Sequence, residues 1–179
     1  MPHRLFVGIR PPEAIRDSLL DIMDGVREAR WQDDDQLHLT LRYIGEVDRH
    51  CANDLSEAFA SADFTPFPLS IHGTAYFERK GRAHTLYATI NRSPELQRLR
   101  NRIEQVCVAA GLEPEHRKYA PHITLARLNA SSGTLLPFLS RTAELQLGPW
   151  TCESYILYES FLRPGGSLYE PVMTYRARS

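Results

Sequence analysis

Apolar residues recur along the first half of the chain at two different spacings. Continuous or alternating apolar patterns, typical of strands, lie at residues 4–9, 37–45 and 67–78. Stripes at helical spacing lie between them, at residues 11–29 and 48–62. Pro12 suits the first turn of the first helix, and Asp48 suits the N-cap of the second. The pattern therefore predicts the order strand, helix, strand, helix, strand.

The same order recurs after a turn with the sequence RKGRA. Strand patterns lie at residues 84–90, 120–128 and 143–148, and helical patterns lie at residues 93–111 and 133–141. Ser93 caps the longer helix and Gly111 ends it. A hairpin built from residues 153–161 and 167–177 closes the chain. The repeated order predicts two structurally similar lobes. Since no linker-like stretch separates them, residues 1–179 are expected to form a single bilobal domain.

Both halves contain a strand with the sequence His-apolar-Thr-Leu, at residues 38–41 and 122–125. A given match should occur about once in ten thousand positions at ordinary composition, so two at equivalent places are hard to ascribe to chance. Side chains alternate along a strand, so His38 and Thr40 share one face with Arg42, and the leucines occupy the other.

His122 and Thr124 share a face in the second motif strand. Arg127 falls on the leucine face there, so it reaches the groove only if the strand ends or bulges. Approximate two-fold symmetry would let the two His-Thr pairs face each other across a groove.

Histidine titrates near neutrality, and a hydroxyl can donate to an anionic oxygen. Two facing pairs would therefore hold one phosphoryl group between an acid and a base, as in-line displacement at a phosphodiester requires. A strand histidine bonded to backbone remains the structural alternative for either motif alone. Zinc would need a third ligand near the histidines, and none is recognisable. The sequence therefore predicts chemistry without a metal or another cofactor.

Composition narrows the partners and the setting. The chain has 42% hydrophobic residues, 24% charged residues and a formal net charge of −1, so overall charge does not hold it to nucleic acid and a polyanion must be gripped locally. No apolar run approaches the roughly 20 residues that a membrane span needs. Residues 1–10 show no signal-peptide layout, and three distant cysteines predict reduced thiols, so we expect a cytoplasmic protein.

The motifs and the blocks around them are similar to those of the two-histidine phosphoesterases. The blocks RLFVGI, LHLTLRYIGEV, RKYAPHITLAR, LGPW and YILYESFLRPGGSLYEPV resemble those of the RNA 2′,3′-cyclic phosphodiesterases, also called LigT-like or 2′-5′ RNA ligases. The resemblance implies an α+β fold of two pseudo-symmetric lobes, each an antiparallel sheet backed by helices, with the active site in the cleft between them. The segment ERKGRAHTLYATI departs from the usual family strand, which can alter the groove rim.

The resemblance also implies an activity and residue roles. Terminal 2′,3′-cyclic phosphates of RNA would be opened to 2′-phosphates, with ATP-independent 2′-5′ joining as the reverse type of step. His38 would be the proton donor and His122 the proton acceptor, although pseudo-symmetry alone permits either assignment. Thr40 and Thr124 would bind phosphate oxygens. RNA ends or smaller cyclic nucleotides would be the partners of a monomer, and a non-catalytic RNA-end or nucleotide-binding module is the alternative.

Several further residues are weaker candidates. Arg127 is the best additional phosphate-binding residue, whereas Arg42 can equally be salt-bridged or solvated. Three tyrosines can either stack on bases or belong to the core. His116 can either contact RNA or be an ordinary surface residue. The acidic residues 33–35 are expected to form a solvated turn. The tyrosines in question are Tyr43, Tyr76 and Tyr87.

Overall fold

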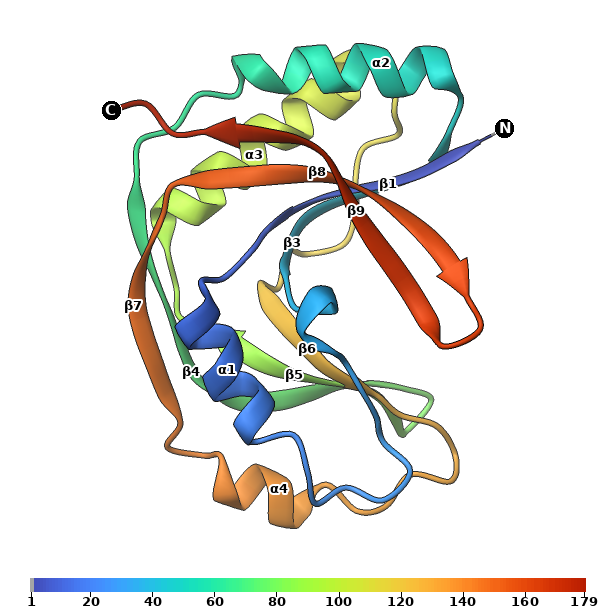
Figure 1. The fold of residues 1–179 in the computed structure, drawn as a ribbon, viewed down its shortest axis with the longest axis vertical. Coiled ribbons are helices and arrows are strands. Elements are labelled where there is room, and N and C mark those ends of the chain that lie inside the picture. The colour runs from blue at the N-terminus through green and yellow to red at the C-terminus, as the bar shows by residue number, and fades with distance from the viewer. Residues whose placement is uncertain (1) are drawn as a thin grey trace.

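The computed structural model describes residues 2–179 and contains one nine-stranded sheet (Figure 1). The strands are β1 (His3–Ile9), β2 (Arg30–Trp31), β3 (Leu39–Val47), β4 (Phe67–Arg79), β5 (Arg82–Ile90), β6 (His122–Arg127), β7 (Gln146–Cys152), β8 (Ser154–Arg163) and β9 (Gly166–Arg176). The helices are α1 (Glu13–Asp21), α2 (Arg49–Ala58), α3 (Pro94–Ala109) and α4 (Leu136–Arg141), with 3₁₀ turns at Asp34–Gln36 and Phe59–Ser61. None of these helices is long and apolar enough to cross a membrane.

The sheet consists of two halves that meet at a single residue pair. Its order is β7-β4-β5-β6-β3-β1-β8-β9, with β2 added beside β6, and the pairings are antiparallel. Within the described residues, only Leu39 of β3 pairs with Ile123 of β6 across the middle. The predicted α+β architecture of two antiparallel lobes is confirmed, and the motif strands are the two strands at the junction.

The helices bind the two halves together by crossing between them. Helix α1 follows β1 in sequence but contacts β7 of the other half, and α3 follows β5 but packs on β3. Helix α2 lies beside α3 and β1, while α4 packs on β4 (Figure 1). Buried residues from both halves form one continuous hydrophobic cluster. The junction between the motif strands is therefore held by a shared core as well as by the sheet.

Most predicted helix boundaries are confirmed, but the first helix is shorter than predicted. Asp48 accepts a hydrogen bond from the Cys51 amide at 2.8 Å, and Ser93 accepts one from the Leu96 amide at 3.1 Å, as N-caps do. Gly111 follows α3 with φ +100°. Pro12, by contrast, occupies the N-cap position of α1 rather than its first turn.

Helix α1 ends at Asp21 instead of continuing to residue 29. The Arg141 guanidinium of α4 donates to the carbonyl oxygens of Ile22 and Asp24 at 3.2 and 3.0 Å. Gly25 follows with φ +82°, which only glycine adopts freely. A cross-half contact therefore satisfies carbonyls at the helix end, and the chain turns away. Val26 still reaches the core, which explains its place in the apolar stripe.

Candidate active site

The two motif strands bring their polar residues together at the junction of the sheet. Leu39 lies opposite Ile123 in the β3–β6 pair, and the strands diverge on either side. In that antiparallel register, the histidine before each paired residue lies opposite the threonine of the other strand, on the same face. The resulting pairs are His38 with Thr124, and Thr40 with His122.

Backbone carbonyls fix both imidazoles in the same way. His38 Nδ1 lies 2.8 Å from the Gln36 carbonyl oxygen, and His122 Nδ1 lies 2.7 Å from the Ala120 carbonyl oxygen. A carbonyl only accepts, so Nδ1 donates in both residues and Nε2 is the atom free for proton transfer. His38 Nε2 lies 2.9 Å from Thr40 Oγ1. In both motifs, a hydrogen bond from Nδ1 to the carbonyl two residues earlier orients Nε2 for proton transfer.

The segment before the first motif is a built support rather than a solvated turn. Asp33 and Gln36 form a reciprocal capping box around the 3₁₀ turn. Asp34 accepts from Arg16 Nε at 2.9 Å, which lowers the pKa of the Asp34 carboxyl, and Arg10 Nη1 donates to the Asp34 and Leu37 carbonyl oxygens. The acidic residues thus form the expected turn, with Asp33 and Asp35 exposed, but Asp34 is also engaged by two arginines. These contacts hold the Gln36 carbonyl that orients His38.

Aromatic rings surround both histidines. The Phe6 ring lies 4.7 Å from the His38 ring, and the Tyr169 ring lies 5.2 Å from it, edge-on. The Phe77 ring lies 4.8 Å from the His122 ring, with Tyr87 at 5.1 Å. Sequence reasoning proposed only Tyr87 among these rings. Phe6 and Phe77 sit in strand patterns that are also typical of core residues, so no signal in the sequence separates them.

Both imidazoles are held in their neutral form. Burial is the main cause that lowers the His38 pKa to about 4, and the positive charges of His122, Arg10 and Arg127 act in the same direction against the Gln36 carbonyl. Burial also lowers the His122 pKa, opposed by the Ala120 carbonyl and assisted by Arg127. The charges that act on the site are therefore positive, so an entering anion would favour protonation of either histidine.

Both motif strands bulge directly after their threonine, and the bulges move the two candidate arginines in opposite directions. In β3 the residue between Thr40 and Arg42 has no partner on β1, and in β6 the residue between Thr124 and Ala126 has none on β5. A bulge of one residue inverts the facing of everything beyond it. The strand alternation predicted from sequence thus holds only as far as Thr40 and Thr124.

Arg42 is held in the wall of the groove by a salt bridge and by backbone carbonyls. Its Nε donates to Glu104 at 2.7 Å, and its other nitrogens donate to the Tyr43 and Glu113 carbonyl oxygens. Its side chain is 7% exposed. The salt-bridged alternative for Arg42 is confirmed, and the guanidinium is engaged by Glu104 although Arg42 is among the residues that line the groove. Tyr43 also lines the groove and is exposed.

Arg127 turns toward the histidines after the second bulge. Its Nη1 donates to Thr85 Oγ1 at 3.1 Å, and its charge lowers the pKa of both His38 and His122. Thr85 is almost fully buried, and no sequence pattern marks it. The bulge that strand alternation requires for Arg127 to approach the histidines is present, although Arg127 is not among the residues that line the groove.

Replacing Arg42 with alanine is expected to lower the free energy of unfolding by about 3 kcal/mol, because it leaves the mostly buried Glu104 carboxylate without its cationic partner. Urea denaturation measures this change. Arg4→Ala is the matched control, since the Arg4–Glu46 pair is exposed and such pairs contribute at most about 1 kcal/mol. Equal destabilisation of the two variants would contradict a structural role for Arg42.

A groove of about 420 Å³ adjoins the paired motifs and is lined by both lobes. The Tyr119 hydroxyl donates to the Thr40 carbonyl oxygen at 2.9 Å, and the Arg100 guanidinium stacks over the Tyr119 ring. Other lining residues include Tyr43, Phe77, Arg79, His84, Arg117, Lys118 and His122. His116 and Tyr76 do not line this groove. The groove offers aromatic faces and cations beside His122, together with the carboxylates of Glu78 and Glu115.

Comparisons with known proteins agree with this architecture. The family model described as the 2′-5′ RNA ligase superfamily matches residues 11–160. A relative from Thermus thermophilus, named RNA 2′,3′-cyclic phosphodiesterase, is 30% identical over 177 residues, which cover 93% of this chain and 86% of that protein. A relative of the same name from Aeropyrum pernix is 29% identical over 150 residues, covering 82% and 85% of the two chains.

Solved structures show the same fold. E. coli LigT complexed with 3′-AMP superimposes with a TM-score of 0.79 at 22% identity and full coverage of both chains. The protein TT0787 of Thermus thermophilus gives 0.78 at 24% identity over 98% of each chain. The bilobal sheet with its paired histidine motifs defines a two-histidine phosphoesterase. Within that class, the chain belongs to the 2′-5′ RNA ligase superfamily.

Proposed function

We propose that this chain is an RNA 2′,3′-cyclic phosphodiesterase that opens terminal cyclic phosphates to 2′-phosphates by acid/base catalysis without a metal. The observation that carries the proposal is the matched fixation of His38 and His122. In each, Nδ1 donates to a backbone carbonyl and Nε2 is left for proton transfer, with that of His38 bonded to Thr40. The strand register places each histidine opposite the threonine of the other motif. The curated relatives carry the name of this activity.

The proposed reaction is an in-line displacement at phosphorus. His122 Nε2 accepts a proton from water, whose oxygen attacks phosphorus, while His38 Nε2–H donates a proton to the departing 3′ oxygen. The P–O3′ bond breaks, and the phosphate remains on O2′. Thr40 and Thr124 donate hydrogen bonds to the non-bridging oxygens, and Arg127 offsets the charge that develops on them. A 5′-hydroxyl in place of water would give a 2′-5′ linkage by the same displacement.

The negative charge of the substrate favours protonation of the histidine that acts as the acid. In the free protein both histidine pKa values are lowered, so a doubly neutral site is the resting form at neutral pH. The cyclic phosphodiester is an anion, and its charge beside Nε2 raises the pKa of whichever histidine donates. Binding of the anion therefore shifts one imidazole toward its protonated form, which can act as the acid. We assign this role to His38 because the resemblance to the two-histidine phosphoesterases implies it.

We further propose that residues 1–179 work as one bilobal domain, as a monomer and in the cytoplasm. The two helices that cross between the halves, α1 and α3, and the shared core support a single unit. The cysteines Cys51, Cys107 and Cys152 are free thiols, which suits a reducing compartment. Gel filtration with light scattering tests the monomer directly.

The decisive experiment is incubation with a ribodinucleotide ending in a 2′,3′-cyclic phosphate, in excess chelator, with the product resolved by ³¹P NMR. We expect complete conversion to the 2′-phosphate with the chelator present. A 3′-phosphate would contradict donation to the 3′ oxygen, and loss of turnover in chelator would contradict metal independence. Binding without turnover would instead support the non-catalytic RNA-end module.

A further inference from the structure

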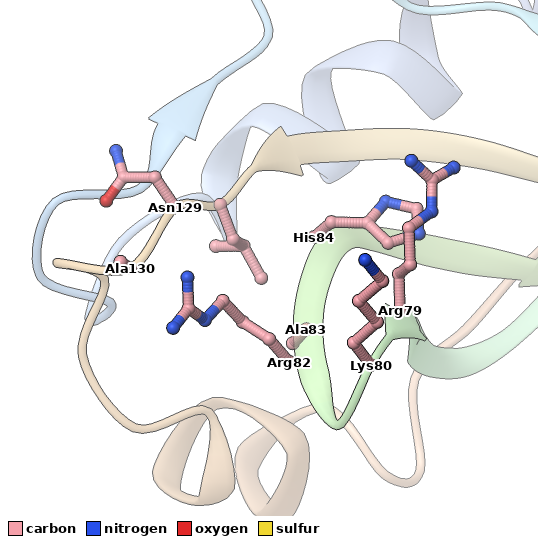
Figure 2. Close-up of a pocket in the computed structure, with 8 residues that line it drawn as sticks. Arg79, Lys80, Arg82, Ala83, His84, Asn129 and Ala130 are labelled. Carbon is pink, nitrogen blue, oxygen red and sulfur yellow. The ribbon is translucent and has the colours of Figure 1, made fainter.

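A second hollow, of about 530 Å³, lies at the β4–β5 hairpin beside the end of β6 (Figure 2). Three of its lining residues are cations, and no carboxylate among residues 2–179 lines it. Figure 2 shows Arg82 extending toward Asn129 across the hollow, while Arg79 lies beside His84. The complete lining is Arg79, Lys80, Arg82, Ala83, His84, Leu128, Asn129 and Ala130. We refer to these residues as the hairpin pocket.

The hairpin makes two arginines cross-strand partners. Lys80 and Gly81 both have positive φ, at 54° and 77°, as the two central residues of a type I′ turn do. Arg79 and Arg82 are therefore direct cross-strand partners with side chains on the same face. Like charges in this position are destabilising. Within the part of the chain that the structure describes, none of the three cations forms an ion pair with a carboxylate.

The remaining polar groups of the hairpin pocket are suited to an anion. Asn129 Oδ1 accepts from the Ser131 amide at 2.7 Å, which leaves the amide nitrogen of Asn129 as a donor. His84 Nδ1 lies 2.8 Å from Thr85 Oγ1, which leaves the other ring nitrogen available. Arginine forks match phosphate oxygens bidentately. A pocket with uncompensated cations and spare donors predicts a phosphate group as its ligand.

The hairpin pocket continues the groove that His122 lines. Arg79 and His84 line both hollows. Thr85 Oγ1 joins them chemically, since it bonds both to His84 and to Arg127, whose charge acts on the two motif histidines. A strand whose 3′ end occupies the motifs can therefore lead along one surface into the hairpin pocket.

We propose that the hairpin pocket binds a backbone phosphodiester of the RNA strand, on the 5′ side of the terminal cyclic phosphate. The inference rests on the proposed function and deepens it: the substrate class would be oligonucleotides rather than cyclic mononucleotides. A cyclic mononucleotide carries no second phosphate, whereas in an oligonucleotide the second phosphate is tethered to the first and binds at high effective concentration. The positive charge of the hairpin pocket would therefore make the enzyme prefer oligonucleotides to mononucleotides.

The test compares Arg82→Glu with Arg49→Glu, a matched reversal of an exposed arginine on α2 that lines neither hollow. Each protein is assayed on a nucleoside 2′,3′-cyclic monophosphate and on a tetranucleotide with the same end. For Arg82→Glu we expect kcat/KM to fall about tenfold or more on the tetranucleotide and to stay within about twofold on the mononucleotide. The salt slope of tetranucleotide binding should weaken by about 0.7 for each phosphate that the variant no longer neutralises.

The outcomes separate the two proposals. If the wild-type protein turns over both substrates and Arg82→Glu lowers neither, or lowers both equally, the hairpin pocket does not bind the strand although the proposed function stands. Fluorescence anisotropy with a tetranucleotide ending in a 2′-phosphate provides a readout that does not need turnover. If catalysis is absent, equal affinities of wild-type and Arg82→Glu protein would still overturn the pocket, and weaker binding by Arg82→Glu alone would support it.

Discussion

Alanine at either His38 or His122 is expected to reduce kcat/KM on a cyclic-phosphate dinucleotide by about 10³-fold. Each positioned acid or base contributes about 10²–10⁴ to the rate. Both histidines have Nδ1 fixed to a carbonyl, so alanine removes an Nε2 atom that is held in a defined position. Initial rates over a range of substrate concentrations measure the effect.

The double variant should be only slightly slower than either single variant. Donor and acceptor act in one displacement, so removing the second group after the first removes little more. His116→Ala is the matched control and should keep full activity, because His116 does not line the groove. Retention of more than a tenth of the wild-type rate by either single variant would refute the two-histidine mechanism.

The element order and the pairing of the motifs could be predicted from the sequence because both depend on local patterns. Alternation along residues 37–40 and 122–124 correctly places each histidine beside its threonine. The crossing of α1 and α3 between halves could not be predicted, because an apolar stripe on a helix does not specify which half of the sheet it packs against. The early end of α1 depends likewise on Arg141, more than a hundred residues away.

The different positions of Arg42 and Arg127 could not be predicted from the sequence. Arg42 and Arg127 lie after motifs of the same type, yet one is held in a salt bridge and the other faces the histidines. Strand alternation predicted the reverse for an unbulged strand. A bulge of one residue has no composition signature at Leu41 or Leu125, since both leucines are equally apolar and both are buried. Only the register with the neighbouring strands identifies it.

Arg127→Gln is expected to lower kcat by about 10²-fold and to move the pH optimum of kcat/KM toward higher pH. The rate effect follows from the loss of a cation beside the developing charge on phosphate. The pH effect has a separate cause. Arg127 holds the pKa of both histidines down, so its removal raises both values.

Both limbs of the kcat/KM profile depend on the histidine pKa values. The kcat/KM profile reports the free enzyme, in which one histidine must be neutral and the other protonated. Because both pKa values are lowered, with that of His38 at about 4, activity should peak below pH 6.5 and fall as the donor loses its proton at higher pH. Raising both pKa values carries both limbs to higher pH together.

Arg127→Lys separates charge from geometry and serves as the control. Lysine keeps the positive charge, so the position of the pH profile should return toward that of the wild-type protein. The fork that donates to Thr85 Oγ1 is absent from lysine, so kcat should recover only in part. A wild-type profile in Arg127→Gln would show that this charge does not act on the histidines. A shift to lower pH would contradict the bulged strand that turns Arg127 toward them.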